Sequence, residues 1–207
     1  MKDKIKYFLN LYNDRKKIDE DLSLWGWGEQ YNEDGAIDQK VIQVLLIKEL
    51  NTNVVEIGCY EGNTTVLFNA AVSILGKNVL AIDPYNGDDG GNEETLQKFV
   101  VRTRNCDNLI FVHNTSQSER AFEAMQDLEY SYCFIDGAHT YEACLSDLLQ
   151  VHFTMNDGGF VCLDDTEIPE VKQAMMEVVE QGLYEWVERD SPNTQCKHKE
   201  YEFLIKI

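Results

Sequence analysis

The sequence predicts an α/β fold in which helices cover a mostly parallel sheet. Short apolar runs recur along the chain, and each is rich in β-branched side chains. Stretches with helical periodicity separate these runs, which is the order of elements in a parallel α/β sheet. The last two segments instead alternate polar and apolar residues, which indicates an antiparallel arrangement at one edge.

Five runs are apolar on both faces, as strands buried in a parallel sheet are. They span residues 53–57, 78–82, 108–112, 131–135 and 158–163. The expected helices span residues 64–75, 93–104, 119–127, 141–154 and 169–180, the last with Pro169 in its first turn. Two more strands, 183–189 and 201–207, flank a turn-rich stretch. We therefore expect a Rossmann-like, doubly wound, seven-stranded sheet that is mostly parallel, with an antiparallel C-terminal strand.

Length and composition indicate a single globular domain. The chain has 207 residues, 43% of them hydrophobic, and no run approaches a membrane span. We expect a helical lead-in, 1–50, followed by the ligand-binding domain, 51–207. The aromatic stretch 24–31 is either a lid over the site or a brace packed on the sheet. The six cysteines show no C-x-x-C spacing, which is typical of buried thiols in a reducing cytoplasm.

The net charge of −19 restricts the partners. Phosphate binding needs a basic surface, so nucleic acid and anionic membrane are not expected. The charge favours neutral or cationic small substrates, although solubility alone would also explain it.

The stretch "VVEIGCYEGNTT" follows the first strand, at the sheet edge where ligands bind in such folds. Gly58 permits a tight turn, and Gly62 lets the next helix approach the strand. A dinucleotide loop would need glycine where Tyr60 and Asn63 stand. The turn is therefore either purely structural or suited to a ligand without a pyrophosphate.

Asp83 ends the second strand, where an acid can accept hydrogen bonds from both ribose hydroxyls. A ribose-bearing ligand without a diphosphate indicates S-adenosyl-L-methionine. An ordinary loop Asp before Pro84 is the alternative. After the third strand, the small polar side chains of residues 113–118 could contact an adenine edge or simply start a helix.

Three carboxylates follow the fourth and fifth strands, namely Asp136, Asp164 and Asp165. Unpaired anions close together are unfavourable unless a divalent cation lies among them. Oxygen ligands suit Mg²⁺. The alternative is that these residues cap the following segments. His139 could take a proton near neutral pH, or it could be a surface histidine beside Tyr141.

Together these motifs resemble class I S-adenosylmethionine-dependent methyltransferases over residues 54–166, and more loosely over the final hairpin. They are most similar to small metal-dependent O-methyltransferases of the catechol and caffeoyl-CoA type, and to the bacterial group that methylates sugars on antibiotics. The segments that carry the resemblance are "VVEIGCYEGNTT", "NTSQSE", "FIDGAHTYEACLSDL" and "GGFVCLDDT".

The resemblance assigns roles to individual residues. It implies that the first turn lies along the methionine part of the cofactor, through Glu56, Gly58, Tyr60, Gly62 and Thr64. It implies that Asp83 binds the ribose and that Ser116 and Gln117 lie by the adenine. It also implies that Asp136, Asp164 and Asp165 bind the metal, so that Asp136 serves both the cofactor side and catalysis.

No residue of this chain matches the general base of either group, so the base is inferred from the position of His139. Catechol-type enzymes carry a lysine where this chain has His139, and the antibiotic-sugar group carries an aspartate where it has Ala138. The expected reaction is metal-assisted O-methylation of a small-molecule hydroxyl, with His139 as the base. The alternatives are a hydroxylase-like oxidative enzyme, which would need a redox metal held by histidine, and a non-catalytic cofactor-binding module. The edge hairpin or the aromatic lead-in could form a homodimer surface.

Overall fold

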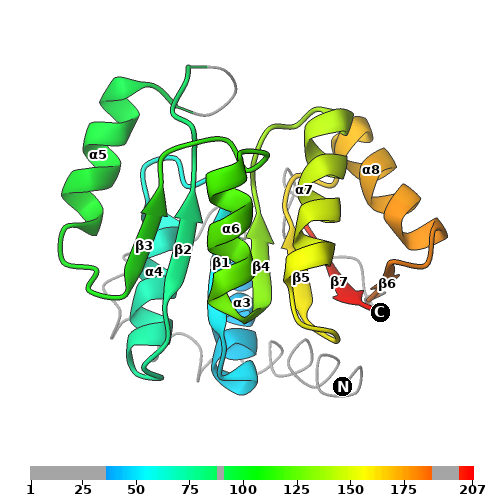
Figure 1. Ribbon diagram of the computed structural model, residues 1–207, viewed down its shortest axis with the longest axis horizontal. Coiled ribbons are helices and arrows are strands. Elements are labelled where there is room, and N and C mark those ends of the chain that lie inside the picture. Colours follow the sequence, from blue (N-terminus) through cyan, green and yellow to red (C-terminus); the bar gives the residue numbers. More distant parts are fainter. Residues whose placement is uncertain (1–35, 88–90, 188–200) are drawn as a thin grey trace.

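The computed structural model describes residues 36–87, 91–187 and 201–207, which form seven strands and six helices (Figure 1). The strands are β1 (Asn53–Ile57), β2 (Val79–Ile82), β3 (Leu109–Val112), β4 (Tyr130–Ile135), β5 (Phe160–Leu163), β6 (Tyr184–Trp186) and β7 (Glu202–Lys206). The helices are α3 (Ala36–Leu50), α4 (Asn63–Ser73), α5 (Glu93–Thr103), α6 (Glu119–Leu128), α7 (Tyr141–Thr154) and α8 (Pro169–Glu180).

All seven strands form one sheet in the order β3-β2-β1-β4-β5-β7-β6. The first five are parallel, and β7 lies antiparallel between β5 and β6. The fold class predicted from the sequence is therefore confirmed. The strand order reverses between β1 and β4, and sheets of this kind bind ligands at the carboxyl ends of the strands around such a reversal.

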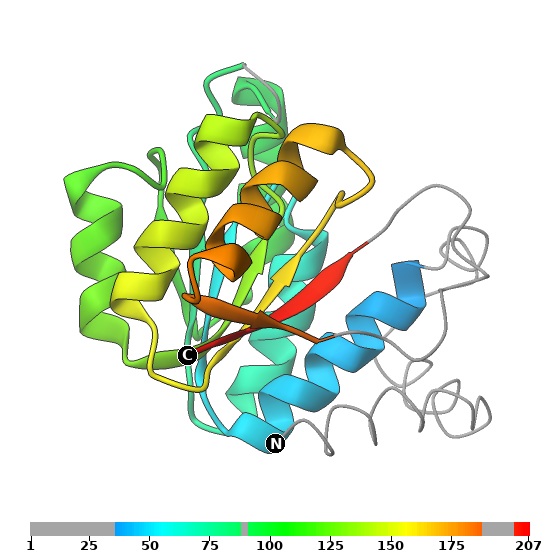
Figure 2. The ribbon, with the colours of Figure 1, turned by 90° about the vertical axis from the view of Figure 1, so that its right-hand side faces the viewer.

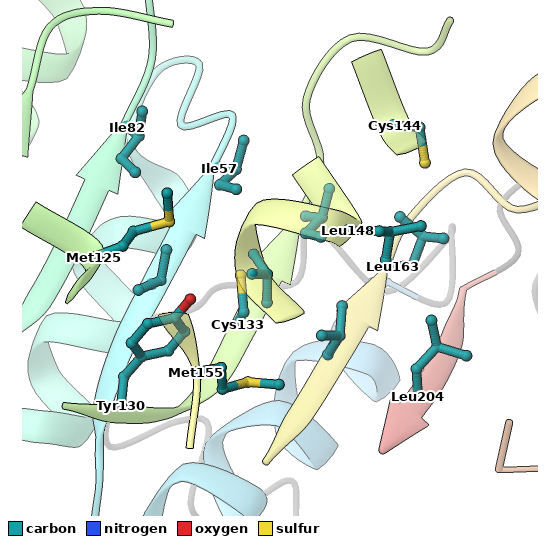
Figure 3. Packing of buried hydrophobic residues seen from close by; sticks show 14 of the residues in the cluster. Ile57, Ile82, Met125, Tyr130, Cys133, Cys144, Leu148, Met155, Leu163 and Leu204 are labelled. Carbon is teal, nitrogen blue, oxygen red and sulfur yellow. The ribbon is translucent and has the colours of Figure 1, made fainter. Parts of the chain in front are cut away.

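Helices cover both faces of the sheet, as Figure 2 shows. Because strand side chains alternate between faces, Val55 and Ile57 of β1 pack with α6, α7 and α8, whereas Val54 packs with α3 and α4. The cluster on the first face includes Cys133 of β4 and Leu148 of α7, both labelled in Figure 3. Burial of these side chains on both faces is the main force that holds the sheet together.

Side-chain caps begin α6 and α7, two of the helices that follow loops at the carboxyl edge. The hydroxyl oxygen of Ser118 accepts a hydrogen bond from the N–H of Ala121 at the start of α6, and that of Thr140 accepts one from Ala143 at the start of α7. Such caps satisfy N–H groups that have no partner within the helix. They define where each loop ends, and so help to place the side chains that the loops carry.

The described part of the lead-in is α3, which packs against α4 and β4. The aromatic stretch 24–31, predicted as a lid or a brace, lies outside the described residues, as does the turn-rich stretch before β7. Among the described helices, none is both long and apolar enough to cross a membrane.

Candidate active site at the carboxyl edge of the sheet

Two glycines with a left-handed backbone shape the turn between β1 and α4. Gly58 has a φ of 85° and Gly62 a φ of 82°. A Cβ on Gly58 would lie 1.9 Å from the carbonyl oxygen of Asp136, so this turn touches the loop after β4 through backbone alone. A Cβ on Gly62 would lie 2.9 Å from the ring of Phe99. Gly62 therefore permits the close approach of α5, and not that of α4 to β1 as we expected from the sequence.

Asp83 holds the same turn from the end of β2. Its carboxylate is buried, and Oδ2 accepts hydrogen bonds from the N–H groups of Cys59 at 2.8 Å and Tyr60 at 3.1 Å. Its other oxygen, Oδ1, accepts from the N–H of Tyr85 at 2.9 Å. An ionised carboxylate can accept about four hydrogen bonds, so Asp83 can still accept another donor. The predicted contact with ribose hydroxyls remains compatible with this arrangement.

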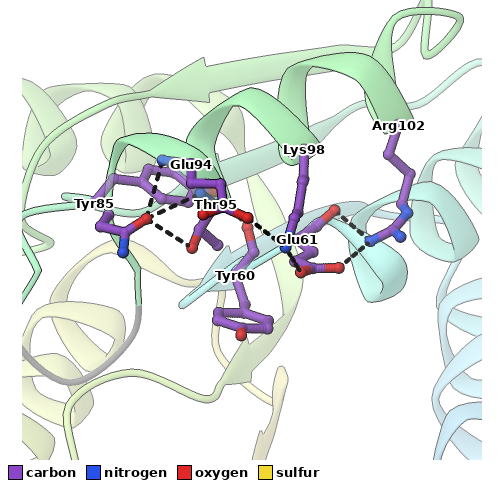
Figure 4. A network of polar contacts seen from close by, with 8 residues as sticks. Tyr60, Glu61, Tyr85, Glu94, Thr95, Lys98 and Arg102 are labelled. Atoms are coloured by element: carbon purple, nitrogen blue, oxygen red, sulfur yellow. Dashed lines mark hydrogen bonds and ion pairs between the residues drawn. The ribbon is translucent and has the colours of Figure 1, made fainter.

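Helix α5 makes polar contacts with the outer side of the turn between β1 and α4 (Figure 4). Lys98 pairs with the carboxylate of Glu61 at 3.0 Å, and Arg102 donates to the carbonyl oxygen of Glu61 at 2.7 Å. The Tyr85 hydroxyl donates to the carbonyl oxygen of Tyr60 at 2.6 Å. The exposed ion pair contributes little by itself, but the two bonds to backbone carbonyls fix the path of the turn. The ring of Tyr60 points away from these contacts and is 57% exposed.

Glu56 is a carboxylate buried beneath the turn. The Thr65 hydroxyl donates to its Oε2 at 2.6 Å, while Oε1 is buried without a hydrogen-bond partner in the described part of the chain. Burial raises the pKa of Glu56 to about 8, although the Thr65 hydrogen bond and the nearby Lys40 ammonium act in the opposite direction. The hydroxyl that contacts Glu56 is thus that of Thr65, which the sequence did not single out; Thr64 is the half-buried residue before it.

The raised pKa of Glu56 predicts a pH-dependent stability. A folded-state pKa near 8 against an ordinary 4.5 means that the folded protein binds an extra proton between these pH values. The free energy of unfolding should therefore fall as pH rises through this window, by up to roughly 4 kcal/mol from this group. We expect Glu56→Gln to flatten the profile measured by urea denaturation at pH 5 and pH 8. The exposed Glu123→Gln serves as the control, and parallel profiles for wild type and Glu56→Gln would contradict the assignment.

A buried carboxylate on α7 holds the segment after β3. Asp147 is 2% exposed, and its Oδ1 accepts hydrogen bonds from the Ser116 hydroxyl at 2.5 Å and from Gln117 Nε2 at 2.9 Å. Burial raises the pKa of Asp147 to about 7, and the Ser116 hydrogen bond opposes this shift. Asp147 was not predicted from the sequence. Its signal is an acid on the apolar face of a helix, beside Cys144 and Leu148.

Asp136, His139 and Asp165 come together at the carboxyl ends of β4 and β5. One candidate ligand atom from each lies within 4.8 Å of the other two, and His139 Nε2 lies 2.9 Å from Asp165 Oδ2. Asp165 reaches this position with a left-handed backbone, at a φ of 54°. The structure therefore brings together two of the three predicted metal ligands and the predicted base.

Asp164, the third predicted ligand, is not a member of this group. It is buried, and its N–H donates to the carbonyl oxygen of Ile135 at 3.0 Å, which extends the pairing of β4 and β5. A set of two carboxylates and one imidazole has the right chemistry for a divalent cation. The imidazole makes Mn²⁺, Fe²⁺ or Zn²⁺ as suitable as the Mg²⁺ that three carboxylates would favour.

Comparison with known families decides the identity of the domain. The sequence model of a family described as a methyltransferase domain matches residues 55–166, which is more than half of the chain. The chain belongs to this methyltransferase-domain family. The match begins in β1 and ends directly after Asp165, so it includes both the glycine turn and the Asp136–His139–Asp165 group.

One curated relative is an uncharacterized protein of Acanthamoeba polyphaga mimivirus. It is 30% identical over 132 residues, which are 60% of this chain, and the chain spans 58% of that relative's length.

Two solved structures illustrate the likeness in fold. An O-methyltransferase from Bacillus cereus, in complex with SAH, superposes with a TM-score of 0.63 at 11% identity, covering 92% of this chain and 90% of that chain. A putative rRNA methylase from Clostridium thermocellum superposes with a TM-score of 0.61 at 14% identity, covering 84% of this chain and 98% of that chain. At these identities the likeness concerns the fold, which the methyltransferase domain shares with enzymes of different acceptors.

Proposed function

We propose that this chain transfers a methyl group from S-adenosyl-L-methionine to a hydroxyl of a small molecule, with the help of a divalent cation. One observation carries the proposal. The turn predicted to bind the cofactor and the loop that carries Asp136 meet at a backbone contact, where Gly58 has no room for a side chain. A methyl donor in that turn would thus lie beside the Asp136–His139–Asp165 group.

The cofactor half of the proposal uses three sets of polar groups. Asp83 would accept the ribose hydroxyls, and Ser116 and Gln117 would face the adenine. The partnerless Oε1 of Glu56 would accept a hydrogen bond from the methionine amine. Glu56 lies near the end of β1, Asp83 directly follows β2, and the Ser116–Gln117 pair lies in the loop after β3. This is the carboxyl edge, where a nucleoside ligand binds in this fold. The Bacillus cereus enzyme, described with bound SAH, supports this choice of ligand.

The proposed methyl-transfer step depends on His139 and Asp165. His139 Nε2 lies 2.9 Å from Asp165 Oδ2, so this carboxylate would stabilise the imidazolium that forms when His139 acts as the base. His139 then takes the proton of the acceptor hydroxyl, the oxygen forms a bond to the methyl carbon, and the carbon–sulfur bond breaks. The other product is S-adenosylhomocysteine, a neutral thioether. A divalent cation would be held by Asp136 and Asp165, with His139 outside its ligand set as the base, and it would lower the pKa of the hydroxyl.

The charge of the chain supports a small acceptor. The Clostridium thermocellum structure is named a putative rRNA methylase, so RNA is the rival acceptor on this fold. RNA binding depends on Lys and Arg neutralising phosphates, whereas this chain has 18 Lys and Arg against 37 Asp and Glu. We therefore assign the proposed reaction to a neutral or cationic small molecule.

Calorimetric titration tests the cofactor. We expect S-adenosyl-L-methionine to bind and NADH to give no signal, because the turn has Tyr60 and Asn63 where a dinucleotide loop needs glycine. Asp83→Ala should weaken binding at least roughly tenfold, since bonds to a charged group are lost. Asp107→Ala, at an exposed position, is the matched control. Binding of NADH, with none of S-adenosyl-L-methionine, would refute the proposal.

A further inference from the structure

Asp147 is a buried acid that the proposed reaction does not use. It lies on α7 and is 2% exposed, and burying a carboxylate is costly unless it is hydrogen-bonded. Its Oδ1 accepts from both Ser116 and Gln117. Its Oδ2 lies against Gly137, where an added Cβ would be only 3.2 Å away. Asp147 thus joins the segment after β3 to the loop after β4.

The bond to Gln117 sets the direction of an exposed amide. Gln117 is at the surface, so its side chain has no role in the core. The end of the amide that faces Asp147 is the Nε2 donor, which lies 2.9 Å from Asp147 Oδ1. The carbonyl oxygen, Oε1, is then directed away from Asp147. Without this acceptor, the amide could turn over and present its donor end instead.

We infer that Asp147 is a positioning residue that holds Gln117 with its carbonyl oxygen toward the ligand and so makes the site select adenine. This inference rests on the proposed function, because it places the base beside Gln117. Adenine carries an exocyclic amine, a donor that a carbonyl oxygen accepts. Hypoxanthine carries a carbonyl at the same position, which would face Oε1 with a second acceptor.

The test measures binding of S-adenosylhomocysteine and S-inosylhomocysteine, which differ at the exocyclic group of the base and at the adjacent N1, an acceptor in adenine and a donor in hypoxanthine. Calorimetry on the wild-type chain should show about tenfold tighter binding of the adenosyl ligand. Asp147→Leu has similar size and no acceptor, and it should lose about tenfold for the adenosyl ligand while the inosyl ligand changes less than about twofold. Asp147→Asn keeps one acceptor oxygen and should retain part of the preference. Asp127→Leu, on the exposed face of α6, should behave as wild type.

The outcomes separate this inference from the proposed function. If the wild-type chain binds neither ligand, the proposed function fails and the inference with it. If both ligands bind but Asp147→Leu weakens them equally, or weakens neither, Asp147 does not set base selection. Thermal melting shows whether Asp147→Leu is folded. If it is not, the smaller Asp147→Ala, which also lacks an acceptor, decides, and an adenosyl preference equal to that of wild type overturns the inference.

Discussion

Replacing Gly58 with alanine is expected to destabilise the protein by more than roughly 3 kcal/mol and to abolish cofactor binding. The added Cβ would lie 1.9 Å from the carbonyl oxygen of Asp136 and 2.5 Å from its carbonyl carbon. Both sides of this contact are backbone, and Asp136 is held by its N–H bond to Ile57. Relief would require β1 and β4 to shift apart. The left-handed φ of 85° adds strain of its own.

Gly76→Ala separates the cost of the steric clash from the cost of the left-handed backbone. Gly76 also has a positive φ, of 64°, but an added Cβ there would meet nothing within 4 Å. We expect it to cost only about 1 kcal/mol, from backbone strain. The free energies of unfolding from urea titrations give the comparison. Equal losses in the two variants would mean that the turn and the loop after β4 are not in the close contact described.

The fold could be predicted because buried parallel strands have a recognisable pattern in the sequence. Runs apolar on both faces placed β1 at its observed bounds and the other parallel strands within two residues. The largest error was at β5, expected from residue 158 but starting at Phe160, because Gly158 has a φ of 73° and belongs to the preceding turn. Local turn geometry of this kind is not visible in an apolar pattern.

The site could be predicted only where a residue directly follows a strand. Asp83 and Asp136 were placed at the carboxyl edge in this way, because the ends of parallel strands meet at one edge. The direction of a side chain was not predictable. His139 and not Asp164 joins Asp136 and Asp165 in the described group. Asp147 escaped notice because its partners lie about 30 residues away along the chain.

The second large effect is expected at Asp165. Asp165→Asn keeps the shape of the side chain but removes the charge that pairs with His139 and would hold a cation. We expect a loss of at least roughly 100-fold in the rate of methyl transfer. Asp164→Asn changes the neighbouring residue in the same way, and because Asp164 lies outside the group we expect less than about a tenfold loss.

Both variants are compared by the release of S-adenosylhomocysteine at saturating S-adenosyl-L-methionine, with melting temperatures to confirm that they are folded. Equal losses of rate in two folded variants would indicate that all three aspartates form the metal site, as the sequence predicted. A larger loss for Asp164→Asn would exclude the Asp136–His139–Asp165 group as the reacting centre.

The central claim is that this carboxyl edge performs metal-assisted methyl transfer to a hydroxyl. The wild-type arm of the same assay tests it most directly, with a panel of phenols, sugars and amines as acceptors, with and without EDTA. We expect at least one hydroxyl acceptor to be methylated, the activity to disappear with EDTA, and excess Mg²⁺ or Mn²⁺ to restore it. Methyl transfer that EDTA leaves unchanged, or transfer to amines alone, would contradict the account.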